Sequence, residues 1–81
     1  MLIKLLASET TLTSATNVST ATVVRVHNTG SAAVVTRKDS EGVTIGTVTL
    51  AENEVVYFEK EPSDTLEGGA DFKAVKIAYS N

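Results

Sequence analysis

The acidic side chains are the groups of this 81-residue chain that could bind a metal ion. Asp64, Glu67 and Asp71 lie close together in sequence, and Asp39 and Glu41 flank a second turn. Calcium takes about six to eight oxygen ligands, which carboxylates and loop carbonyls can supply. No D-x-D-x-D-G run is present, so ordinary solvated loop carboxylates are the expected alternative to a calcium site. The sequence therefore predicts no metal and no cofactor.

Nucleophilic chemistry has little support in the sequence. His27 is the only histidine, and it falls on the outer side of an expected strand beside a turn, where it faces solvent or an interface. The serines lack the strand–elbow–helix context that exposes a nucleophile. Gly68-Gly69 is not followed by Lys-Ser/Thr or a helix, so no phosphate loop is implied. We predict that the protein is not an enzyme.

Composition and charge exclude several further classes. Seven basic and ten acidic residues give a net charge of −3, and the dispersed basic residues form no stripe for nucleic acid. The absence of cysteine rules out disulfides and thiolate metal sites. The apolar start of the chain is broken by Lys4, and no stretch approaches the roughly 18 apolar residues of a membrane span. We expect no nucleic-acid and no membrane partner.

The elements that would position these side chains are strands. Valine, isoleucine and threonine number 11, 3 and 12, about a third of the chain, and such β-branched residues favour strands. No window has the apolar period of a helix longer than two turns, and at most 63–67 makes a single turn. We predict one all-β domain over 1–81, a small antiparallel β-sandwich or barrel of about six to seven short strands without substantial helix. The expected strands are 2–7, 18–27, 32–38, 43–50, 54–60 and 72–79, with a polar loop or arm at 8–17 and a long loop at 61–71. Asn28-Thr29-Gly30 supplies a turn, so 32–38 is expected to return as the hairpin partner of 18–27. A second turn is expected at 39–42, with Gly42 placed for a positive φ.

Two strands carry more specific patterns. In 18–27, alternation puts Val24 and Val26 on one side and Arg25 and His27 on the other. In 43–50, Gly46 suggests a bulge or a close backbone approach.

The strand 54–60 is apolar on both sides. Val55 and Tyr57 point one way, whereas Val56 and Phe58 point the other. A strand with two apolar sides fits an enclosed central position, a core with an exposed aromatic, or a surface that another subunit covers. These four residues and Tyr79 form the candidate interface.

Three stretches carry a family resemblance: VSTATVVRVHNTGSAAVVTRKDSEGVTIGTVTL, NEVVYFEKEPSDTL and AVKIAYSN. Together the three stretches extend over 16–81. They contain a strand end Val-x-Asn, a strand Gly-x-x-x-Gly, a segment Glu-Lys-x-Pro-x-Asp-Thr and a strand Ala-Val-x-x-Ala-Tyr. In these motifs the chain resembles small virion structural proteins of tailed bacteriophages, especially those that infect marine cyanobacteria. The motifs are structural, so no active-site residues carry over.

The resemblance implies a protein that is made in the cytoplasm of a bacterial host and incorporated into a virion. Its partners would be the major capsid protein or neck and tail proteins, and it would be a homo-oligomer or bound to a lattice. A chain this short buries only about 60% of its unfolded surface, so assembly offers further burial. We expect a small capsid-decorating or cementing protein that docks through apolar strand faces and strand edges. The alternatives are a neck or tail protein, or a receptor- or glycan-binding module in which Tyr57 and Tyr79 form an exposed sugar-stacking platform.

Overall fold

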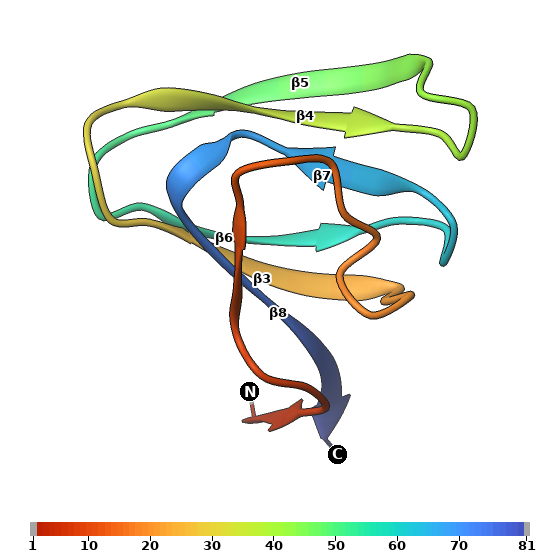
Figure 1. Cartoon of the computed structure of the whole chain (residues 1–81). Coiled ribbons are helices and arrows are strands. Elements are labelled where there is room, and N and C mark those ends of the chain that lie inside the picture. The colour runs from red at the N-terminus through yellow and green to blue at the C-terminus, as the bar shows by residue number, and fades with distance from the viewer. Residues whose placement is uncertain (1, 81) are drawn as a thin grey trace.

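The protein is a two-layer antiparallel β structure (Figure 1). The computed structural model describes residues 2–80, and this part of the chain contains eight strands and no helix. The all-β prediction is confirmed. The strands are β1 (Leu2–Leu5), β2 (Thr10–Leu12), β3 (Val23–Asn28), β4 (Ala33–Lys38), β5 (Thr44–Leu50), β6 (Val55–Glu59), β7 (Thr65–Glu67) and β8 (Gly69–Ser80).

The strands form one five-stranded and one three-stranded sheet. The larger sheet has the order β1-β8-β3-β6, with β2 also paired to β8, and the smaller sheet has the order β5-β4-β7. β8 is twelve residues long, so it can pair with β2 and β3 along its first part and with β1 at its end. This arrangement leaves β6 at one edge of the larger sheet and β5 at one edge of the smaller sheet.

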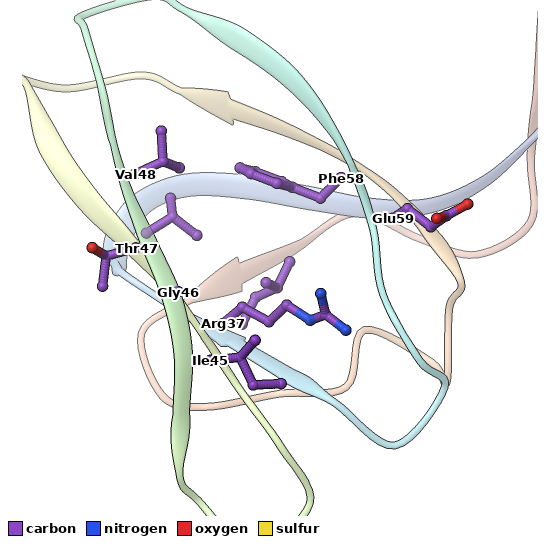
Figure 2. A pocket seen from close by; sticks show the side chains of 9 residues that line it. Arg37, Ile45, Gly46, Thr47, Val48, Phe58 and Glu59 are labelled. Atoms are coloured by element: carbon purple, nitrogen blue, oxygen red, sulfur yellow. The ribbon is translucent and has the colours of Figure 1, made fainter.

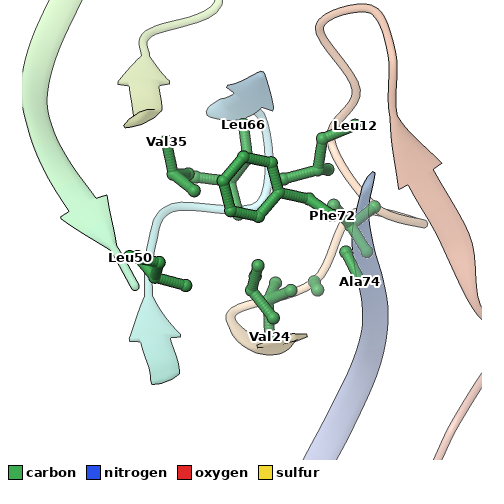
Figure 3. Packing of buried hydrophobic residues seen from close by; sticks show 10 residues of the cluster. Leu12, Val24, Val35, Leu50, Leu66, Phe72 and Ala74 are labelled. Atoms are coloured by element: carbon green, nitrogen blue, oxygen red, sulfur yellow. The ribbon is translucent and has the colours of Figure 1, made fainter. Parts of the chain in front are cut away.

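The hydrophobic core lies between the two sheets (Figure 3). Phe72 is its largest fully buried side chain and lies among residues of both sheets, including Leu12, Val35 and Leu66. Gly68 is required beside this ring, because a Cβ there would lie 2.7 Å from Phe72 Cδ2. The close approach lets the chain turn from β7 into β8 directly over the core.

The prediction of a strand over 18–27 is wrong for its first five residues. Val18, Ser19 and Thr20 have φ of 52°, 58° and 55°, which form a left-handed turn instead of extended backbone. The Asn17 side chain accepts a hydrogen bond from the Thr20 N–H at 3.1 Å, and the Asn17 carbonyl accepts one from the Ala21 N–H at 3.2 Å. Local side-chain bonding of this kind competes with a strand ladder. From Val23 onward the predicted alternation is confirmed, with Val24 and Val26 buried.

Both predicted loops contain a strand. The polar segment 8–17 includes β2, and Leu12 is fully buried in the core. The segment 61–71 includes β7, in place of the single helical turn considered for 63–67, and Leu66 is also buried. Each of these strands has three residues and one apolar side chain, so neither carries a visible alternation.

Strand ends differ from prediction, whereas the glycines at 42 and 46 agree with it. The first strand ends at Leu5 and β8 begins at Gly69, so the first is shorter and the last longer than expected. Gly42 has a φ of +85°, as its turn requires. Opposite Gly46, the pairing of β4 with β5 shifts register between Arg37 and Lys38, which confirms an irregularity at this glycine.

Candidate functional site

β6 is an edge strand, which excludes the enclosed central position for the segment 54–60. Its two sides differ in surroundings. Val56 and Phe58 are half-buried and pack against the core cluster. Val55 and Tyr57, on the other side, are 36% and 40% exposed.

Tyr79 joins Tyr57 on the side of the larger sheet that faces away from the core. Tyr57 is opposite Arg25 of β3, and Arg25 is opposite Val75 of β8, so these three residues share one side. Two-residue alternation along β8 then places Tyr79 on the same side. The two tyrosine rings lie with centroids 6.3 Å apart at an interplanar angle of 48°, and Tyr79 is 47% exposed.

We call the exposed side chains of Val55, Tyr57 and Tyr79 the tyrosine face. Val75 and Ile77 share this side of the sheet and are buried, although they lie outside the core cluster between the sheets. The tyrosine face therefore belongs to a second apolar side of the larger sheet. Of the five candidate interface residues, the structure exposes three together here and turns Val56 and Phe58 toward the core.

A polar rim lies beside the tyrosine face. Arg25 Nη1 is 3.9 Å from Glu9 Oε2, and both side chains line a hollow of about 450 Å³ next to β1. Leu5, which is 70% exposed, lines the same hollow. An apolar centre with charged groups at its margin is the usual anatomy of a protein–protein contact.

A second hollow opens between the edge strands β5 and β6 (Figure 2). Its volume is about 210 Å³. Arg37 and Glu59 contribute its charged groups, and its other lining residues are Val35, Ile45, Gly46, Thr47, Val48, Phe58 and Leu66. Sequence reasoning missed this hollow, because it depends on two strand edges of different sheets lying near each other.

Arg37 takes part in a partly buried polar cluster near this hollow. Its Nε donates a 3.0 Å hydrogen bond to Asp64 Oδ2, and its Nη2 bonds the same oxygen. The hydrogen bond from Arg37 holds the pKa of the Asp64 carboxyl below its usual range, although burial opposes this shift. The pair fastens the turn before β7 to β4.

Lys60 is a buried cation that binds backbone carbonyl oxygens. Its Nζ donates to the carbonyl of Ala21 at 2.7 Å and of Glu61 at 3.2 Å. Burial lowers the pKa of Lys60, while the charge of Asp64 raises it in part. The ammonium group is thus satisfied by main-chain acceptors and joins the start of β3 to the end of β6.

The candidate calcium ligands do not come together. Asp64 is paired with Arg37, and Glu67 accepts a 2.7 Å hydrogen bond from Lys38 Nζ. Across residues 2–80, no three His, Asp or Glu side chains are placed to hold a metal ion. His27 is half-buried on the outer side of β3, between its register partners Val55 and Lys73.

Comparison with protein-family models finds no match, and the searches of curated proteins and of solved structures find none either. In the described part of the chain, no helix has the length and hydropathy to cross a membrane.

Proposed function

We propose that the protein is a non-enzymatic structural subunit of a bacteriophage particle, a small capsid-decorating or cementing protein. The observation that carries the proposal is the tyrosine face. Its two aromatic rings and Val55 are exposed on the same side of the larger sheet as the buried residues Val75 and Ile77. The phage setting is inferred from the sequence resemblance of residues 16–81.

A partner that covers the tyrosine face would bury apolar ring surface that is now in contact with solvent. Tyrosine is enriched at protein interfaces because a large apolar ring is buried while its hydroxyl still finds a partner. Tyr57 and Tyr79 are each nearly half exposed, so much of both rings is available for burial. Arg25 and Glu9 at the margin supply the charged rim that sets orientation. The expected partner is the major capsid protein, with neck or tail proteins as the other candidates.

Two measurements test the proposal. Mass spectrometry of purified virions should find the chain in intact particles, and its absence from them would refute the phage role. In the second, Tyr57→Ser and Phe58→Ser are compared for binding to the particle and for thermal melting.

The two variants should separate docking from folding. Tyr57 is 40% exposed, so Tyr57→Ser should weaken binding by about 2 kcal/mol and lower the melting temperature much less than Phe58→Ser does. Phe58 packs against the core, so Phe58→Ser should lower the melting temperature markedly. If Tyr57→Ser reduces the free energy of unfolding as much as the free energy of binding, Tyr57 serves the fold alone.

A receptor- or glycan-binding module is the second candidate function, and the Tyr57–Tyr79 pair favours it. Two exposed rings 6.3 Å apart can stack against a sugar face. On a glycan array, Tyr57→Phe should then keep binding while Tyr57→Ala loses it. An array on which the wild-type chain binds no glycan would remove this candidate and leave the structural role in place.

A further inference from the structure

β5 is an edge strand whose only protection against pairing, among the described residues, is the bulge near its start between Thr44 and Gly46. Natural sheet edges are blunted by charged residues, proline, β-bulges, short length or a covering segment. β5 runs for seven residues, Thr44–Leu50, and contains neither a charged residue nor proline. Every residue of β5 except Leu50 is exposed.

The other edges of the described chain carry such protection. β7 has three residues, and Thr16 covers it through backbone hydrogen bonds in both directions with Leu66. β6 ends in Glu59, and β1 has Lys4 at its centre. β5 is thus the edge whose side chains best permit another strand to pair with it.

We propose that two copies of this chain pair through β5, antiparallel, around a two-fold axis at Thr47. The partner is a second copy because β5 is complementary to itself. An uncharged strand meets no like-charge repulsion from its own copy. Antiparallel pairing about Thr47 also keeps residues of one side opposite residues of the same side over 46–48, the stretch around the axis beyond the bulge.

The side-chain sizes fit this register. Pairing about Thr47 places Gly46 of each copy opposite Val48 of the other. A Cβ built on Gly46 would meet nothing within 4 Å, and Gly46 is not among the residues of positive φ, so neither crowding nor backbone conformation requires glycine there. Val48 is 41% exposed beside the hollow between β5 and β6. In the pair, the valine of one copy covers the open position over the glycine of the other.

The resulting dimer has one continuous sheet of β7-β4-β5 from each copy. Gly46, Thr47 and Val48 also line the hollow in front of Phe58, so the pairing lies at one border of that hollow (Figure 2). The tyrosine face belongs to the other sheet and stays free for a different partner. The inference therefore does not depend on the phage role, and the two can fail separately.

Introducing a charge of either sign at Thr47, on the axis, tests the proposal. Thr47 is exposed, so Thr47→Lys and Thr47→Glu should fold and melt like the wild type. Sedimentation equilibrium should show a wild-type dimer, and each variant alone should have a dissociation constant raised at least about tenfold by like charges facing across the axis. An equimolar mixture of the two variants should restore dimers, and the exposed-turn variant Ser14→Lys should dimerise like the wild type.

A crosslink gives a second, independent readout. The described chain has no cysteine, so Thr47→Cys introduces one thiol per copy. Directly opposed strand residues approach closely enough for a disulfide, so oxidation should give a covalent dimer, whereas Ser14→Cys should not. A wild-type chain that stays monomeric, or Thr47→Lys that dimerises like the wild type, would overturn the proposal. Either result would leave incorporation into virions untouched.

Discussion

Replacing Asn28 by alanine should be among the most damaging single changes in the molecule. Asn28 is the last residue of β3, and its side chain is fully buried. Its Nδ2 donates to the carbonyls of Ser31, Leu50 and Ala51 at 2.9, 3.1 and 3.3 Å, and its Oδ1 accepts the Gly30 N–H at 3.0 Å. One amide thus links the larger sheet to the end of β5 in the smaller one.

The size of the effect follows from how deeply each bond lies. The bond to Leu50 is buried, and leaving a buried polar group unpaired costs about 1–3 kcal/mol. The bonds to Ser31, Ala51 and Gly30 are partly buried, where water can replace some of the loss, so each contributes about 0.5 kcal/mol. Asn28→Ala should therefore lower the free energy of unfolding by about 3 kcal/mol. A domain of this length has roughly 4–12 kcal/mol in all, so a large part of its stability depends on this amide.

Urea unfolding followed by circular dichroism measures this loss, and the melting temperature should fall by about 12–24 °C. Thr29→Ala is the matched neighbour, because its hydroxyl bonds the Asp71 carbonyl at an exposed position and should change stability by about 0.5 kcal/mol. Asn28→Asp keeps the shape but turns a carboxylate toward three carbonyl oxygens, so it should be at least as damaging as Asn28→Ala at neutral pH. Equal urea midpoints for Asn28→Ala and Thr29→Ala would refute this role of the Asn28 amide.

Three further predictions concern charge, packing and backbone conformation. The pKa of Asp64 in the folded chain lies below its ordinary value of 3.8, so the contribution of Asp64 to stability is complete above pH 3.8 and is lost as pH falls through the folded pKa. Asp64→Asn should therefore reduce the loss of stability with acid, measured by urea titrations at pH 2–5. An unchanged acid profile would contradict the role of the Asp64–Arg37 pair. Gly68→Ala should lower the free energy of unfolding by about 1–3 kcal/mol, since the added methyl group meets the Phe72 ring at 2.7 Å. An unchanged free energy of unfolding would mean that the ring moves aside without cost. Ser19→Gly should raise the melting temperature, because Ser19 is exposed in a left-handed conformation that costs a non-glycine residue about 1–2 kcal/mol. A lower melting temperature of this variant would argue against that conformation.

The sequence predicted those parts of the fold in which apolar residues alternate over several positions. The alternation around Val24 and Val26 is of this kind. The strands expected at 32–38 and 43–50 are present as β4 and β5. The expected hairpin of 18–27 with 32–38 is wrong, because β3 pairs with β6 and β8 whereas β4 lies in the other sheet between β5 and β7. Leu12 and Leu66 were missed because a three-residue strand presents one apolar side chain and no period. The left-handed turn at Val18 was missed because its threonines and valine favour extended backbone, whereas hydrogen bonds to Asn17 decide the local structure.

The candidate site was predictable in composition but not in arrangement. The apolar pattern of 54–60 marked Val55 and Tyr57, and the structure exposes both. That Tyr79 lies beside Tyr57 depends on the pairing of β3 with both β6 and β8, and no local pattern encodes such a strand order. Asn28 looked like a turn residue, because its neighbours are Thr29 and Gly30, yet its amide is the most deeply buried polar group of the fold.

The position of β8 has a consequence for how the chain is made. β8 comes after the other seven strands in sequence, yet it is the strand to which β1, β2 and β3 all pair (Figure 1). During translation, β1 and β2 emerge from the ribosome before β8 and remain without their hydrogen-bonding partner until β8 has been synthesised. Contacts between distant parts of a chain are slow to form, and unpaired strands are prone to aggregate meanwhile. The larger sheet can thus form only after synthesis of β8. A chain truncated before Phe72 would leave β1 and β2 without most of the strand to which they pair.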